Sequence, residues 1–498
     1  MVVKILNNLR KYCNLKFCEF SNLKIMKKIT AILLILTAYF ANGQDTHYQT
    51  QQFGTRSALL GGAVVGGVRD NTALFYNPGS LGFIDTAMVS INANLYKVEN
   101  IKILNAVGEQ ADFKTANFVT VPLLIAGMLP SKNPRLKWGY GLGGPMHFTF
   151  NGNGRVDGPY SIVNDAESPG EENYTGQAQV KTKSNETLAG LGLGYRLNKN
   201  WSVGLTNQIT IRSVEYTNVV LSRFYLNNQD LDLVSSNIWK STKYNHWRYA
   251  AKFGIAYTNK NWDMGLTLTT PSVTIYGKGN VSSDITANDI LFNGVRRDIY
   301  ANDSQEKLKT NYKAPLKIGS GINFRSGKSV IGISGEYCGS VEVYDVITAK
   351  PGAFVRPPEL APNFGSENYL KVKSAAKSVL NLAIGYEYKL KETMSLMFGL
   401  RTDNSWYDST IQSQIGIKPE ITTWDIYHFS GGVSIVKGRT TISLGLLLGV
   451  GGDNDYYQGN NLDEPSEGTF LQGLTTITEA KYSSFGALVG FSFNFKKF

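Results

Sequence analysis

Apolar and polar residues alternate over many short stretches of the chain after residue 85. In one of them Trp262, Met264, Leu266 and Leu268 occupy every second position, with polar or small residues between them. A period of two is typical of β-strands that present one apolar face. We count fourteen such stretches, so the pattern predicts an all-β protein.

The gaps between these stretches alternate strictly between short and long. Six are short, near 129–135, 198–200, 259–261, 325–328, 390–393 and 437–440. Seven are long, near 98–116, 151–186, 215–245, 271–312, 340–376, 403–422 and 452–475. Short periplasmic turns and long extracellular loops are the pattern of outer-membrane barrels. The sequence therefore predicts a 14-stranded antiparallel transmembrane β-barrel over residues 86–498, in the outer membrane of a Gram-negative bacterium.

Composition and charge exclude other classes of protein. Mean hydropathy of −0.17 excludes a bundle of apolar helices but fits a barrel, whose strands alternate. The net charge of +11 falls to +5 without residues 1–43, which hold seven Lys or Arg and one Glu, so nucleic acid is not an expected partner. Cys338 is the only cysteine after residue 43, which excludes a disulfide framework and a cysteine zinc site.

The beginning of the chain has the features of a secretory signal. Lys27 and Lys28 precede twelve mostly apolar residues over 29–40, and small residues follow at 41–43. This stretch is shorter than the roughly 20 residues that span a membrane as a helix. We expect residues 1–43 to be an upstream extension plus a signal peptide, with Met26 as the true start.

Residues 44–85 lack an alternating strand and are rich in glycine and small apolar residues. Because such a segment can pack closely against the inside of a barrel wall, we expect it to form a hatch, or plug, in the lumen. The segment contains the sequence DNTALFYNPGSL, which supplies the candidate hatch motif Asp70, Asn71, Tyr76, Asn77 and Pro78.

This sequence resembles the hatch motif of the FadL-type outer-membrane transporters, whose pattern is close to D-N-A-S-A-x-Y-Y-N-P-A-x-L. It departs from that pattern at Gly79 and Ser80, where the family usually has Ala after the Pro. The resemblance implies a 14-stranded barrel, an internal hatch and the uptake of hydrophobic molecules, typically long-chain fatty acids or aromatic hydrocarbons.

An apolar molecule that crosses the outer membrane needs an apolar surface on the outside. The third and fourth long loops are the most apolar. We expect capture at Phe224, Leu231, Trp239, Ile285 and Phe292. Leu231, Val234 and Ile238 also fit the spacing of a helix. The alternative is that these loops merely pack on each other.

The next requirement is a ligand pocket inside the barrel. The predicted lining is Phe53, Leu74 and Phe75 of the hatch, with Ala383, Met397 and Leu447 of the wall. Each buried methylene contributes roughly 0.8 kcal/mol, so a long acyl chain or a fused aromatic should bind better than a short molecule.

An exit is expected where the third strand is broken by Gly143, Gly144 and Pro145. Proline removes a hydrogen-bond donor from the ladder and glycine permits a bulge, so a lateral gate could open there. The resemblance implies the same feature, because that family has an inward kink in its third strand. The alternative is a strand that loosens at the edge of the membrane.

Charged residues also alternate with the apolar face. If Ser326 and Gly327 form a two-residue turn, Lys317 and Glu336 lie opposite each other as a lumen ion pair. We interpret these charges as a network that braces the wall. The alternative is that one basic residue anchors the carboxylate of a fatty acid.

An enzyme and an interaction protein are the alternative functions for such a barrel. The four histidines after residue 43 belong to no catalytic motif, so we expect no enzyme, no cofactor and no metal site. The stronger rival is an accessory or shuttle barrel of a protein secretion system, docked through a proline-rich loop near 351–362. The expected partners are hydrophobic small molecules or lipids and the lipid of the outer membrane, or a secretion-machinery protein in the rival reading.

Overall fold

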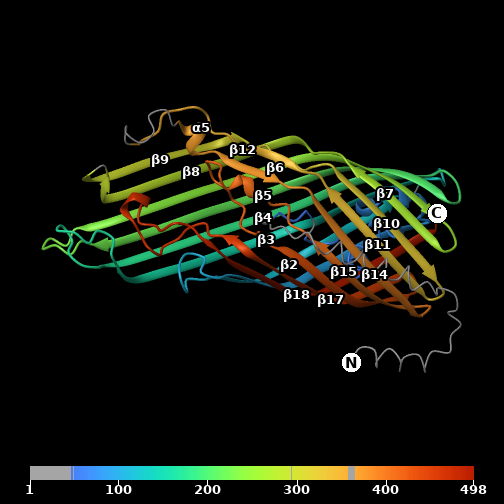
Figure 1. Ribbon diagram of the computed structural model, residues 1–498. Helices are drawn as coiled ribbons and strands as arrows, with labels where there is room; N and C mark the ends of the chain where they lie inside the picture. The colour runs from blue at the N-terminus through green and yellow to red at the C-terminus, as the bar shows by residue number, and fades with distance from the viewer. Residues whose placement is uncertain (1–45, 49, 130, 293, 357–364, 498) are drawn as a thin grey trace, which may run out of the picture. The chain divides into compact units, whose positions relative to one another are not determined.

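The computed structural model describes residues 46–48, 50–129, 131–292, 294–356 and 365–497 (Figure 1). The predicted upstream extension and signal peptide at 1–43 lie outside these residues, as does part of the proline-rich loop. None of the helices that the structure describes is long and apolar enough to cross a membrane.

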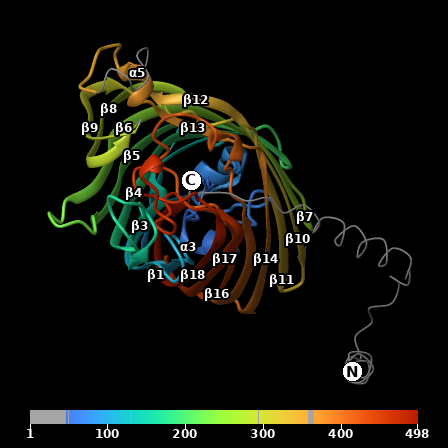
Figure 2. The same ribbon diagram turned by 60° about the vertical axis from the view of Figure 1, so that its left-hand side comes forward.

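Fourteen antiparallel strands form a closed ring, which confirms the predicted barrel (Figure 2). The last strand pairs with the first, and β5 pairs with β6. The ring consists of β1 (Thr86–Ile103), β2 (Phe113–Leu129), β3 (Leu136–Tyr160), β4 (Glu172–Arg196), β5 (Trp201–Tyr225), β6 (Leu233–Thr258), β7 (Trp262–Thr269), β10 (Lys317–Ser326), β11 (Ser329–Cys338), β14 (Val379–Lys391), β15 (Met394–Asp403), β16 (Asp425–Lys437), β17 (Thr440–Tyr457) and β18 (Ile477–Lys497).

The outer face of the ring is apolar in the band next to the short turns. In β17 the side chains of Leu444, Leu446 and Leu448 point outward and are 44 to 52% exposed, whereas Ser443 points inward and is buried. An exposed band of this kind is stable only against hydrocarbon. The alternation in the sequence therefore reports contact with lipid.

The wall is much taller on one side than on the other. Strands β3 to β6 have 25 or 26 residues, but β10, β11 and β15 have 10. The chain leaves the ring after β7 and continues as β8 (Val273–Phe292) and β9 (Val295–Lys309), which extend the sheet from the upper half of β6.

The long gaps near 151–186, 215–245 and 271–312 were predicted as loops, and this prediction is wrong. Most residues of the first two gaps continue β3 to β6, and most residues of the third form β8 and β9. The helical spacing near 231–238 is also not realised. Val234 pairs with Phe224 and Ile238 pairs with Val220, so both lie in β6. The connections between the ring strands contain β12 (Val341–Ile347), β13 (Val372–Ala376), α5 (Ser366–Tyr369) and the turns η2 (Ser409–Ile411) and η3 (Glu467–Thr469). Of these, η3 bonds to β8 and α5 bonds to β9.

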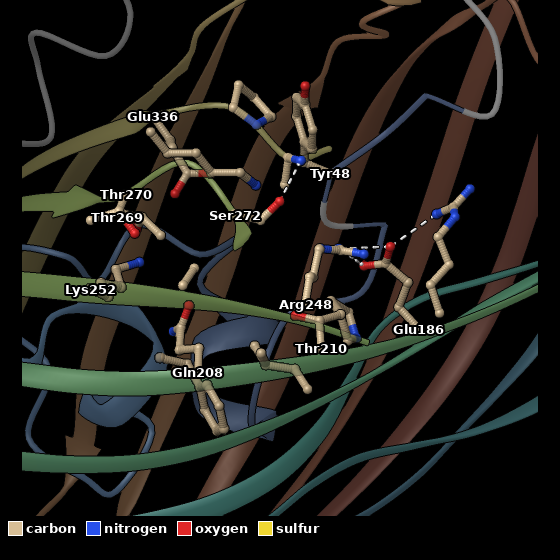
Figure 3. Close-up of a pocket in the computed structure, with 18 of the residues that line it drawn as sticks. Tyr48, Glu186, Gln208, Thr210, Arg248, Lys252, Thr269, Thr270, Ser272 and Glu336 are labelled. Carbon is tan, nitrogen blue, oxygen red and sulfur yellow. Dashed lines mark hydrogen bonds and ion pairs between the residues drawn. The ribbon is translucent and has the colours of Figure 1, made fainter. Parts of the chain in front are cut away.

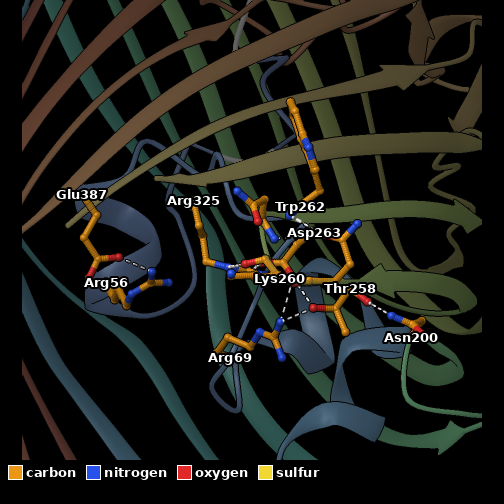
Figure 4. Close-up of polar contacts among 11 residues, drawn as sticks. Arg56, Arg69, Asn200, Thr258, Lys260, Trp262, Asp263, Arg325 and Glu387 are labelled. Atoms are coloured by element: carbon orange, nitrogen blue, oxygen red, sulfur yellow. Dashed lines mark hydrogen bonds and ion pairs between the residues drawn. The ribbon is translucent and has the colours of Figure 1, made fainter. Parts of the chain in front are cut away.

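The segment before β1 contains α3 (Thr55–Leu59), α4 (Ala73–Tyr76) and η1 (Pro78–Phe83). It bonds to strands from many sides of the ring. Arg56 pairs with Glu387 of β14, and Arg69 Nη2 lies 2.7 Å from Asp263 Oδ1 of β7 (Figure 4). Asn71 Nδ2 donates to the carbonyl of Ala126 in β2, at 2.8 Å. A segment that reaches strands so far apart in the ring lies inside the lumen.

Candidate functional site

The hatch motif fixes the hatch to the wall and to itself. Asn77 Nδ2 donates to the carbonyls of Val65 and Ile255, at 3.1 and 3.0 Å, and its Oδ1 accepts the amide of Gly79. Asp70 accepts hydrogen bonds from the amide and hydroxyl of Thr72. These residues act by positioning the hatch, and Pro78 lies directly against the wall at Gly204.

Tyr76 connects the motif to the start of the described chain. Its hydroxyl donates to Gln52 Oε1 at 2.8 Å and accepts the amide of Phe53 at 3.0 Å. Burial raises the pKa of Tyr76, so the hydroxyl stays protonated and can donate. Tyr76 therefore holds the stretch that precedes the hatch helices, residues 46–48 and 50–52, which we call the strap.

The strap crosses the lumen from Pro145 in β3 to the connection between β15 and β16. At one end Gln51 N and Thr50 Oγ1 donate to the carbonyl of Pro145, at 3.0 and 3.4 Å. At the other end Tyr48 stacks on Trp406, with ring centroids 5.8 Å apart, and His47 Nε2 lies 3.0 Å from the carbonyl of Trp424. The strap thus contacts the predicted gate directly.

The structure shows an interrupted ladder at that predicted gate. The pairing of β3 with β4 slips between Gly143 and Met146. Among the described residues, β2 and β3 pair only where 125–129 meets 138–142. Above this point side chains bridge the two strands, because Thr115 Oγ1 donates to the carbonyl of Asn151 at 2.8 Å. Gly143, Gly144 and Pro145 lie where backbone pairing between β2 and β3 ends.

A small cavity of about 80 Å³ lies beside the strap (Figure 3). Glu186 lies at one side of it, 2.9 Å from Arg212 Nη1 and 2.8 Å from Arg248 Nη2, and Arg212 also packs over the ring of Tyr312. Lys252, Lys317 and Glu336 line the same cavity. Four basic side chains against two carboxylates give this cavity a positive lining.

Lys317 and Glu336 do not form the predicted cross-strand pair. The turn consists of Gly327 and Lys328, so Lys317 lies opposite Cys338 and Glu336 lies opposite Gly319. A slip of two residues keeps both side chains on the inner face, because the side-chain period of a strand is two. The ammonium of Lys317 instead lies 4.1 Å from the ring centre of Tyr48 in the strap.

The six predicted pocket residues face the lumen but do not surround one apolar cavity. Phe53, Leu74, Phe75 and Met397 belong to the packed core between hatch and wall. Phe53 stacks on Phe75 with centroids 4.5 Å apart, and both rings also line the cavity beside the strap. Ala383 lines a second cavity of about 60 Å³ and Leu447 a third of about 30 Å³. The hatch therefore fills most of the apolar space that the sequence suggested for a ligand.

A larger cavity of about 550 Å³ lies nearer the end of the barrel that carries the long connections, and we call it the vestibule. It lies between the inner face of the tall wall and the connections after β15 and β17. Its lining includes Phe113, Phe150, Tyr216, Tyr407, Ile417 and Tyr456. Lys240 and Lys418 add basic groups. The size is typical of a small-molecule site. Sequence reasoning missed this cavity, because its lining comes from segments that are far apart in the chain.

The five predicted capture residues are not brought together. Phe224 is buried inside the wall, and Ile285 lies opposite Ile238 on the same inner face. Leu231 is 59% exposed at the tip between β5 and β6. Trp239 is next to Ile238 and so points to the outer face, and Phe292 packs against the upper core.

No protein-family model and no curated protein matches the sequence. Solved structures do match. The toluene transporter TodX of Pseudomonas putida is 12% identical, with 90% of this chain and 100% of that chain covered at a TM-score of 0.52. A FadL homologue of Pseudomonas aeruginosa is 11% identical, with the same coverage and a TM-score of 0.55.

A TodX variant described as a monoaromatic hydrocarbon channel is 13% identical, and 89% of this chain and 99% of that chain are covered at a TM-score of 0.52. At such low identity the likeness establishes the fold alone. This chain therefore has the fold of the FadL-type outer-membrane transporters, as its hatch motif predicted.

Proposed function

We propose that this chain is an outer-membrane channel for the passive uptake of hydrophobic molecules. The closed barrel with its apolar outer band supports a membrane location, and the short turns then face the periplasm. The solved structures with the same fold are described as toluene transporters, a hydrocarbon channel and a FadL homologue. Long-chain fatty acids and aromatic hydrocarbons are the substrate classes that follow. Residues 1–43 would be removed on export.

Capture takes place in the vestibule in this proposal, instead of at the surface groove expected from the sequence. The vestibule of about 550 Å³ can hold such a ligand, whereas the lumen cavities of about 30 to 80 Å³ are smaller than the roughly 150 Å³ that hold a benzene molecule. Passage beyond the vestibule therefore requires the strap and part of the hatch to move. The carboxylate-anchor alternative stays open at the positive cavity beside the strap.

The ligand leaves through the wall at the break in β3. The single observation that carries this step is the interrupted β2–β3 ladder, beside which the strap bonds to the carbonyl of Pro145. Backbone pairing closes a barrel wall, so a seam without it can open at a lower cost than any fully paired seam. Release of the strap from Pro145 would uncover this seam from the inside.

The experiment straightens the break with Gly144→Val and Pro145→Thr and measures the uptake of labelled toluene and labelled oleate by cells. The same strand offers a matched control, because Gly158 and Pro159 repeat the dipeptide near its extracellular end. A Cβ at Gly158 meets only Tyr160, at 3.6 Å. We expect uptake to fall to background in the first variant and to stay near the unmodified level in Gly158→Val with Pro159→Thr.

Retained uptake in a folded barrel with a straightened β3 would exclude the lateral gate. Within the residues that the structure describes, which leave out 357–364 of the proline-rich loop, no observation favours the secretion alternative. Co-purification of a large partner with a ligand-free barrel would favour it, whereas bound hydrophobic ligand would favour uptake. The proposal assigns the protein no catalytic step.

A further inference from the structure

The two ends of the barrel carry opposite charge. The six short turns named above hold nine Lys or Arg and one Glu, a net charge of +8. The seven long gaps of the sequence pattern, which hold the far ends of the strands and the connections between them, contain 18 Lys or Arg and 29 Asp or Glu, a net charge of −11. Every one of the six turns contains at least one basic residue. Such a concentration of positive charge at one end of the barrel attracts anionic partners.

Eight of the nine turn cations are exposed, and we call them the basic rim. They are Lys132, Arg135, Lys199, Lys260, Lys328, Lys391, Lys437 and Arg439. None of the eight forms an ion pair within the described part of the chain, whereas the ninth, Arg325, is paired with Asp263 (Figure 4). A ring of unpaired like charges is repulsive, so anionic groups bound from outside would stabilise it.

The basic rim lies at a definite depth relative to the membrane. Trp138, Trp201 and Trp262 point outward directly after three of the turns and are 36 to 45% exposed. Trp201 packs on Tyr257 with ring centroids 4.9 Å apart. Aromatic girdles of this kind lie at the level of lipid headgroups. Lys199 and Lys260 lie in the turns two residues before Trp201 and Trp262. Their long side chains can therefore place the ammonium groups beside headgroup phosphates.

We propose that the basic rim binds the phosphate groups of anionic phospholipids in the leaflet that faces the periplasm. The inference rests on the proposed membrane location and orientation and is independent of any transported ligand. Basic groups beside a membrane surface attract anionic lipid by about fivefold in partitioning for each cation. Lipid bound around the whole rim would fix the depth of the barrel and surround the periplasmic side of the hatch with anionic headgroups.

Native mass spectrometry of the full barrel tests this by counting the phospholipids retained from an equimolar mixture of phosphatidylglycerol and phosphatidylcholine. The rim variant carries Lys→Gln changes at 132, 199, 260, 328, 391 and 437, one in each turn. The matched control carries six Lys→Gln changes at exposed extracellular positions, which are 181, 183, 278, 307, 309 and 350. Both variants lose six positive charges. Heat-dependent migration in gels confirms that each barrel is folded.

The unmodified protein and the control are expected to retain several-fold more phosphatidylglycerol than phosphatidylcholine, and the rim variant is expected to retain the two equally. A rim variant that keeps the preference for phosphatidylglycerol overturns the proposal. A control variant that loses this preference to the same extent also overturns it, because the effect would then come from net charge alone. A milder variant, Lys199→Gln with Lys260→Gln, provides a second readout. In vesicles its tryptophan fluorescence should be quenched less by brominated phosphatidylglycerol, and unchanged quenching would contradict the proposal. Neither measurement involves uptake, so their failure is distinct from failure of the channel function.

Discussion

Glycines let the hatch backbone approach the barrel wall at contact distance. A Cβ on Gly204 of β5 would lie 2.1 Å from the carbonyl oxygen of Pro78, and a Cβ on Gly265 of β7 would lie 2.1 Å from that of Val65. Both distances are far below van der Waals contact, and the atoms met belong to the backbone, which cannot rotate away. These two positions therefore set how closely the hatch and its motif can lie against the wall.

Gly204→Ala should loosen the hatch, with Gly139→Ala as the matched control. A Cβ at Gly139 meets side-chain atoms of Leu81 and Met128 at 3.4 Å, which is ordinary contact. Overpacking costs about 1 to 3 kcal/mol, so the first variant should show faster hydrogen exchange over residues 73–83 and a lower unfolding temperature. The second should match the unmodified protein. Equal protection of the hatch in both variants would contradict the proposed role of Gly204.

His47 should make docking of the strap sensitive to pH. Burial lowers the pKa of His47, an effect that Asp403 and Asp425 oppose and Arg401 reinforces. In a released strap the imidazole would titrate near 6.5. The docked strap therefore binds the proton less readily, so docking is fully stable above about pH 6.5 and weakens below it, by at most about tenfold per pH unit.

Hydrogen exchange over residues 46–52, corrected for intrinsic rates, measures this effect at pH 7 and pH 5. His428 also lies close to Asp403, so the variant His47→Gln is needed to assign the dependence. We expect exchange in the unmodified strap to accelerate at pH 5, and the acceleration to disappear in the variant. The same acceleration in His47→Gln would assign the titration to another group.

At the scale of strands, the sequence predicted the number of wall strands but not their length. In the membrane the outward side chain is apolar, as with Ile209 and Leu191. Higher in β4 the outward face meets water, so Lys181 and Lys183 point out while Val180 points in. The alternation thus reverses within one strand. A pattern of outward apolar residues ends where the outward residues become polar. From sequence alone, the rest of the strand therefore looks like a loop.

The turn between β10 and β11 shows a second limit of the sequence. Ser326-Gly327 and Gly327-Lys328 are both acceptable two-residue turns from composition alone. The structure uses the second, with Gly327 in the left-handed region at a φ of 57°. Which side of the wall each residue faces was therefore predictable, since successive side chains alternate between the two sides. The partner of Lys317 was not, because it depends on a choice of register.

The connection between β15 and β16 forms one side of the vestibule, and a bulky residue there should block it. Ser413 and Ser409 of the neighbouring turn η2 are both exposed, but only Ser413 lines the cavity. Ser413→Trp fills space that a ligand would occupy, so it should reduce uptake of labelled toluene or oleate several-fold. Ser409→Trp places the same ring outside and should leave uptake unchanged. Equal uptake in both variants would place capture elsewhere.

At the scale of the whole molecule, wall and hatch depend on different parts of the sequence. The ring closes through β1 and β18 without any residue of the hatch. The hatch motif was recognisable in the sequence because its residues follow one another within a short segment, 70–81, even though Asn71 and Asn77 bond to distant strands. The cavities were not, because they are the spaces that remain after hatch residues pack against inward residues of many strands. A candidate route for a ligand through this protein thus could be identified only in the folded barrel.

Deletion of residues 46–84 should leave a folded barrel with an open lumen. Ladder pairing around the ring supplies closure, but the packed core that includes Phe53, Leu74 and Met397 loses its hatch side and becomes exposed to water. We expect conductance in planar bilayers to rise from background to that of a stable open pore, with heat-dependent gel migration showing a folded barrel. Arg56→Ala removes only the bond to Glu387 and should give brief openings. A folded deletion variant that stays silent would show that the lumen is closed by the wall itself and not by the hatch.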